Sequence, residues 1–166
     1  MAHIFENSHT DKTPFCETNR LSYDDILKQR DLLIGQSAFK ALSESLEFPV
    51  LILNEHKQVV FLNTAALDCV HEHDHPDHVL GFRFGEFLGC NHMFNGKGCE
   101  DPSTCANCNE LPAILSALDG RIAEAEGVLT LFENNAENGM DYKVSCHPFI
   151  FNEEAYALVK LIPLSA

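Results

Sequence analysis

The sequence predicts an α+β fold, with one five-stranded antiparallel sheet, helices on one face of the sheet and an N-terminal helical extension. Two observations lead to this prediction. The expected elements follow the order helix, two short strands, a helical middle and three longer strands, with polar turns between them. The chain has 166 residues, 45% of them hydrophobic, which is enough for one domain of ordinary size and a modest extension.

The N-terminal part of the chain divides into a tail and a helix. Residues 1–20 are polar and lack periodicity, so we expect a flexible tail. Ser22 with Asp25 forms a weak capping box, and a helix is expected from there to about residue 46, with Gly35 as a point of interruption. Two apolar rows follow this helix: Leu32, Phe39 and Leu46 with Leu42 between them, and Leu27, Ile34 and Ala41. Such a wide apolar surface favours residues 21–47 as a homodimer contact, and packing on the chain's own sheet alone is the alternative.

The sheet is expected within residues 48–166. Segments 48–54 and 58–63 are rich in Val, Ile, Leu and Phe and are separated by a polar turn, which is typical of a hairpin. Asn63 or Thr64 can cap a short helix after it. Asn109 is a good N-cap for a helix that ends near Gly120. Strands at about 121–132, 140–151 and 155–164 then complete the sheet.

Charge and hydropathy exclude several classes of function. The formal net charge is -14, so nucleic-acid backbones and anionic lipid surfaces would be repelled. We therefore expect a partner protein or a small molecule as ligand. The apolar runs are too short for a signal-peptide core or a membrane span, which favours a cytoplasmic protein.

Four of the seven cysteines form a dense cluster. Cys90, Cys99, Cys105 and Cys108 are separated by eight, five and two residues. The last pair lies just before the helix that begins after Asn109, and the partial positive charge of its N-terminus favours thiolates. Four thiolates suit zinc or an iron–sulfur cluster, whereas a redox disulfide and unliganded thiols are the alternatives.

Histidines near the cysteine cluster are further candidate metal ligands. His92 could substitute for one thiolate of the cluster. The segment from His71 to His75 matches the zinc-protease pattern H-E-x-x-H, but Pro76 follows it and no apolar residue could pack it as a helix. We therefore expect a solvated loop there, with an auxiliary metal site including His78 or a small zinc hydrolase as less favoured alternatives.

Three segments have a characteristic order and spacing: 48–53, 60–63 leading into 65–66, and 144–148. Through these segments, residues 48–164 resemble the PAS family of sensory domains. The segment 81–92, followed by Cys99, Ser103, Cys105 and Cys108, resembles the cysteine-bearing PAS domains of bacterial sensor proteins. This resemblance implies a sensory role and a sheet that cradles a small molecule or cofactor against its helical middle. The chain ends at Ala166 without the segment that commonly links PAS domains to an output domain, which favours a stand-alone module that signals through a partner.

Strand alternation and helical spacing predict the lining of such a cavity, although a filled core is the alternative. The candidates are Leu51, Leu53, Phe61, Ile114, Leu118 and Val144. Cys69 and Cys146 lie in apolar segments, where thiols usually act as small buried hydrophobes.

No complete catalytic set is readable, so we expect a signalling module and not an enzyme. The leading hypothesis is a sensor of redox state or oxygen that carries an iron–sulfur cluster or zinc. The alternative is an interaction protein whose zinc only pins a loop.

Overall fold

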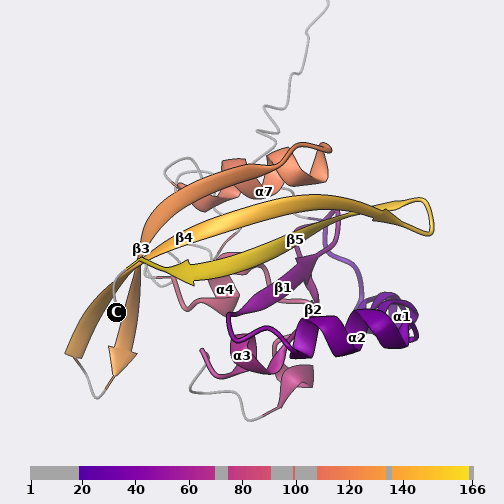
Figure 1. Ribbon diagram of the computed structural model, residues 1–166, viewed down its shortest axis with the longest axis horizontal. Helices are drawn as coiled ribbons and strands as arrows, with labels where there is room; N and C mark the ends of the chain where they lie inside the picture. The colour runs from indigo at the N-terminus through magenta and orange to yellow at the C-terminus, as the bar shows by residue number, and fades with distance from the viewer. Residues whose placement is uncertain (1–18, 70–74, 91–98, 100–107, 134–135, 165–166) are drawn as a thin grey trace, which may run out of the picture.

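The computed structural model describes residues 19–69, 75–90, 99, 108–133 and 136–164. Its core is one antiparallel sheet with the strand order β2-β1-β5-β4-β3, which confirms the predicted α+β fold (Figure 1). The strands are β1 (Val50–Leu53), β2 (Val59–Leu62), β3 (Ala123–Glu133), β4 (Ala136–Phe151) and β5 (Glu154–Pro163). The helices are α1 (Tyr23–Ile34), α2 (Ser37–Glu44), α3 (Thr64–Leu67), α4 (Phe84–Phe87) and α7 (Glu110–Leu118), with a 3-10 turn at Pro76–His78.

The expected N-terminal helix is two helices, because the helical period breaks at Gly35 and Gln36. Ser22 caps α1 by accepting a hydrogen bond from the backbone N–H of Asp25 at 3.2 Å, and α1 ends at Gly35. Ile26 is fully buried in the core, so α1 belongs to the domain itself and is not only an extension. In the described part of the chain, we find no helix long and apolar enough to cross a membrane.

The first strand lies between its hairpin partner and the last strand of the chain. β1 pairs with β2 on one side and with β5 on the other, and Val50 is opposite Lys160. All four residues of β1 and all four of β2 are buried. The hairpin of β1 and β2 is therefore held in the sheet by β5, the last of the five strands in sequence.

The register assigns side chains to the two faces of the sheet. Val159 is opposite both Leu51 and Cys146, so these three residues share one face. Helix α7 packs on the β3, β4 and β5 part of the sheet (Figure 1). Phe61 is opposite Ile52, on the other face, where Phe39 of α2 meets it edge-on with ring centroids 5.1 Å apart. The N-terminal helices therefore reach the face opposite to that of Leu51.

Asn63 connects four segments through one buried side chain. Its Oδ1 accepts hydrogen bonds from the backbone N–H groups of Val50 and Ala66, at 2.9 and 3.0 Å. Its Nδ2 donates to the carbonyl oxygens of Ser43 and Phe48, each at 3.0 Å. The side chain thus caps α3, as the sequence predicts, and also holds α2 and β1 in place.

We predict that Asn63→Ala destabilises the fold by about 3 kcal/mol, because several buried backbone groups lose their hydrogen-bond partner. Urea unfolding followed by circular dichroism measures this change. Asn109→Ala is the matched control, since Asn109 is exposed and its side chain makes no capping bond. Its expected effect is within about 0.5 kcal/mol. Equal losses from the two substitutions would contradict the role given to Asn63.

Candidate functional site

Two of the clustered cysteines lie against the short helix α4. The backbone N–H of Cys90 donates to the carbonyl oxygen of Gly85 at 2.8 Å. A Cβ atom at position 85 would lie only 3.0 Å from the sulfur of Cys99 and 3.6 Å from the Cβ of Cys90. Gly85 therefore leaves the room in which Cys99 approaches α4 beside Cys90.

The helix α4 is also tied to the segment that precedes α1. Arg20 forms a bidentate ion pair with Glu86, and Glu86 also accepts a hydrogen bond from the backbone N–H of Arg83 at 2.9 Å. Burial raises the pKa of Glu86, but the hydrogen bonds from Arg20 and Arg83 outweigh it, so the pKa lies below its ordinary value. The carboxylate is therefore held ionised between two arginines, one residue from Gly85.

Cys108 lies at the N-terminus of α7. Its thiol donates a hydrogen bond to Oε2 of Glu110 at 3.2 Å. The hydroxyl of Tyr142, on β4, donates to the other oxygen of the same carboxylate. A Cβ at Gly127 of β3 would overlap Oε1 of Glu110 and lie 3.1 Å from the Tyr142 oxygen. The carboxylate of Glu110 thus contacts Cys108 before α7, Tyr142 on β4 and the backbone at Gly127 on β3.

The electrostatics of Cys108 differ from the sequence prediction. Backbone N–H groups of Glu110 and Leu111 do lower the pKa of the thiol, as expected at a helix N-terminus. Burial first, and then the charge of Glu110, raise it further, so the pKa of Cys108 is about 12. The helix N-terminus therefore acts in the predicted direction, but burial and the neighbouring carboxylate outweigh it in the metal-free protein.

Cys99 has a similar balance. Burial raises the pKa of its thiol, and the charges of Glu86 and Cys90 add to that effect. A hydrogen bond from the backbone N–H of Gly85 and the guanidinium of Arg83 act in the opposite direction, but the pKa still lies above its ordinary value. Arg83 is 2% exposed, which places a buried positive charge close to this sulfur.

The structure brings the cluster together only in part. Cys90 lies with Cys99 at α4, and Cys108 lies with Glu110 at α7. Both Cys90 and Cys108 are near enough to Tyr142 for their charges to raise its pKa, after burial and the Glu110 contact. Cys105 and His92 lie outside the described residues. Within the described ranges, no three potential ligands converge closely enough to hold a metal ion, and no cysteine forms a disulfide.

Sequence reasoning missed Glu110 and Tyr142. Glu110 carries a weak signal, since it is two residues after Cys108 and in the first turn of the expected helix. Tyr142 carries none, because its contact depends on how β4 lies under α7.

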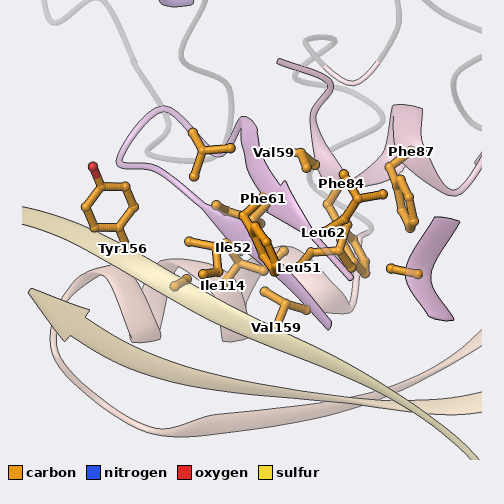
Figure 2. Packing of buried hydrophobic residues seen from close by; sticks show 14 of the residues in the cluster. Leu51, Ile52, Val59, Phe61, Leu62, Phe84, Phe87, Ile114, Tyr156 and Val159 are labelled. Atoms are coloured by element: carbon orange, nitrogen blue, oxygen red, sulfur yellow. The ribbon is translucent and has the colours of Figure 1, made fainter. Parts of the chain in front are cut away.

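The cavity candidates divide between the faces of the sheet. Leu51, Leu53 and Val144 share the face on which α7 lies. Ile114 of α7 packs in the same buried cluster as Leu51 (Figure 2). Leu118 is partly buried against this cluster. Phe61 lies on the opposite face, so the expectation that it lines the same space is wrong. The hairpin pairing, which alternation alone does not specify, sets its direction.

The remaining candidates lie elsewhere. Residues 71–74 of the histidine-rich segment are outside the described residues. His75 is an exposed residue whose Nδ1 lies 3.4 Å from Asp77, and its ring centroid is 6.1 Å from that of His78. Cys146 is fully buried in the core, as expected, and Cys69 is half-buried.

No protein-family model matches the sequence, and no curated protein matches it as a relative. The structure is similar to that of the PAS domain of BvgS from Bordetella pertussis, with a TM-score of 0.52 and 15% identity over 80% of this chain and 88% of that chain. The chain has a PAS fold. A weaker likeness, with a TM-score of 0.48 and 18% identity, relates it to a LOV protein from Rhodobacter sphaeroides over 83% of this chain and 68% of that chain. At such identities the PAS likeness establishes the fold alone.

We predict that Cys146 is modified by iodoacetamide at pH 8 at least about tenfold more slowly than Cys90 in the metal-free folded protein. Cys146 is fully buried and burial raises its pKa to about 12, whereas Cys90 is only half-buried. Mass spectrometry of a digest measures both rates, and the urea-unfolded chain is the control, in which they should be equal. Similar rates in the folded protein would contradict the place of Cys146 in the sheet.

Proposed function

We propose that this chain is a PAS-type sensory module that binds a metal centre through its cysteine cluster and signals through protein–protein contacts. The single observation that carries the proposal is the position of the described cysteines. Cys90 and Cys99 lie at α4, and Cys108 lies at the start of α7, which packs directly on the sheet. Cys105 joins them in this proposal from its place in the sequence.

The residues around the cluster suit a thiolate centre. Backbone N–H groups point at the sulfurs of Cys99 and Cys108, and the buried guanidinium of Arg83 offsets negative charge near Cys99. These donors and this cation stabilise thiolates once a metal replaces the thiol protons. A bound metal would supply strong positive charge and fixed ligand geometry, which the metal-free protein does not provide.

A change at the centre has a direct route to the rest of the domain. Cys108 immediately precedes α7, and Glu110 of that helix contacts Tyr142 in the sheet. Metal binding or a change in oxidation state would alter the contacts at the start of α7 and shift the helix against β4. The outer surface of the domain would then differ between the two states, which a partner protein can read.

A structural zinc site is the second candidate. It is favoured by the number of cysteines in the cluster, since four cysteines are also a common ligand set of structural zinc sites. Colour separates the two candidates: protein purified without oxygen absorbs visible light if it carries an iron–sulfur cluster and does not if it carries zinc.

We predict that serine in place of Cys90, Cys99, Cys105 or Cys108 lowers the metal content per chain, because each substitution removes one ligand. Elemental analysis of protein purified without oxygen measures the content. Cys69→Ser and Cys146→Ser are the controls and should keep full metal. The proposal fails if the cluster variants keep full metal while a control loses it, or if the wild-type protein carries none.

We also propose a homodimer as the signalling assembly, held by the N-terminal helices. Leu32 and Leu42 are 50% and 68% exposed, so part of the predicted apolar rows faces outward. Deleting residues 1–46 is not a clean test, because Ile26 and Leu33 are core residues. A test that spares the core changes the exposed leucines only.

We predict that Leu32→Glu with Leu42→Glu yields monomers at tens of micromolar, where the wild-type protein is a dimer, since two buried charges would oppose association. Light scattering measures the mass. Ile150→Glu, at an exposed position near the tip of the β4–β5 hairpin, is the control and should remain dimeric. A monomeric wild-type protein at this concentration would contradict the proposed homodimer.

A further inference from the structure

Cys90 and Cys99 are both attached to one residue of α4. The backbone N–H of Cys90 donates to the carbonyl oxygen of Gly85 at 2.8 Å. The sulfur of Cys99 accepts a hydrogen bond from the backbone N–H of the same glycine. Eight residues separate the two cysteines in sequence, so their approach to one glycine is a product of the fold.

The distances around Gly85 suit a bond between the two sulfurs. The Cβ atoms of Cys90 and Cys99 lie 3.6 and 3.8 Å from the position that a Cβ of residue 85 would take, and the sulfur of Cys99 lies 3.0 Å from it. A disulfide needs about 3.5–4.5 Å between its Cβ atoms. Both Cβ atoms lie around one point that the glycine leaves open, so a local movement can bring the sulfurs into contact.

The helix that carries this pair is fixed to its surroundings. Arg20 pairs with Glu86 of α4, and Glu86 accepts a hydrogen bond from the backbone N–H of Arg83 at 2.9 Å. Phe82, just before the helix, accepts a hydrogen bond from the backbone N–H of Val59 of β2 at 2.7 Å. Groups that are held beside each other react faster than groups that must first meet.

The other described cysteines are engaged differently. Cys108 donates to Glu110, and the thiol of Cys69 donates to the carbonyl oxygen of Ala65 at 3.5 Å. Cys146 is fully buried in the core. Among the described cysteines, only the two at α4 therefore share one contact residue.

We propose that Cys90 and Cys99 form a reversible disulfide when the metal-free protein meets a hydroperoxide, so that α4 carries an oxidant-sensitive pair. One sulfur attacks hydrogen peroxide, which breaks the oxygen–oxygen bond, releases water and leaves a sulfenic acid. The second sulfur displaces the hydroxyl group as water and forms the sulfur–sulfur bond. The two thiols thus give up two protons and two electrons, and one peroxide becomes two water molecules. A small thiol reverses the step by exchange.

The bond would also regulate the proposed metal site, because it uses two of the four cysteines assigned there as ligands. A sulfur in a disulfide is no longer available as the thiolate that a metal requires. Oxidation would therefore release the metal, and bound metal would protect the pair. This consequence rests on the proposed function, whereas the disulfide itself requires no metal.

Mapping the disulfide in metal-free wild-type protein tests the proposal. The protein is reduced, stripped with a chelator, treated with hydrogen peroxide, alkylated and digested without reductant. Trypsin cuts after Lys97 and a glutamate-specific protease cuts after Glu100, so Cys99 is the only cysteine on its peptide. We expect mass spectrometry to find this peptide linked to that of Cys90, and dithiothreitol to separate them. A link from Cys99 to another cysteine, or no link, would overturn the proposal.

Substitutions give the second readout. Cys90→Ser and Cys99→Ser should each abolish the linked peptide. Cys108→Ser is the matched control, since it removes a proposed metal ligand but should keep the disulfide. In the wild-type protein, Cys90 and Cys99 should be consumed by peroxide at least about tenfold faster than Cys146. Loss of the disulfide in Cys108→Ser, with unchanged far-ultraviolet circular dichroism, would contradict the assignment to this pair.

The outcomes separate this inference from the proposed function. If the wild-type protein binds metal but the metal-free form makes no bond between Cys90 and Cys99, this inference fails and the metal site stands. If the bond forms and no metal binds under any condition, the metal site fails and the oxidant-sensitive pair stands. If both are present, peroxide should lower the zinc content per chain, and dithiothreitol with added zinc should restore it.

Discussion

The packing of α7 on the sheet is the contact on which the rest of this structure depends. Ile114 and Ala117 are each 1% exposed beneath it, and they seal the face that carries Val144 and Cys146. The same packing fixes the distance between the N-terminus of α7 and β4. At that distance, Glu110 accepts a hydrogen bond from the hydroxyl of Tyr142. Core packing and the cysteine site therefore depend on each other. Helix α7 has nine residues, and a movement at its N-terminus also displaces the side chains that it packs on the sheet.

Much of the fold could be predicted from the sequence because its signals are local. Polar turns and the apolar segments between them predict the five strands. Asn63 is recognisable as a helix cap because asparagine is a common N-cap residue. The face of Phe61 could not be predicted, since every residue of β1 and β2 is buried and no polar position marks the outside. Pairing with other strands decides which face of the sheet such a side chain occupies, and the local sequence pattern does not specify that pairing.

The candidate site shows the same limit in electrostatic terms. Spacing alone predicts that Cys90, Cys99 and Cys108 belong together, and the structure brings the first two to one helix. Whether the pKa of Cys108 rises or falls depends on burial and on the neighbouring carboxylate of Glu110. The position of Cys108 before a helix does not reveal either of these effects. Tyr142 belongs to β4, a strand that begins 28 residues after Cys108, so its contact with Glu110 could be found only from the tertiary structure.

The pairing of β1 with β5 has a consequence for how the chain is made. Val50 and Lys160 are about 110 residues apart in sequence, so β1 has no second neighbour until the ribosome has synthesised the chain as far as β5. During that time a short hairpin of Val, Leu, Ile and Phe exposes an unpaired edge to other nascent chains. Such non-local closure makes folding slow, and slow folding lengthens the period in which the hairpin can aggregate. Synthesis at low temperature, with fewer chains made at once, should therefore favour recovery of this protein in folded form.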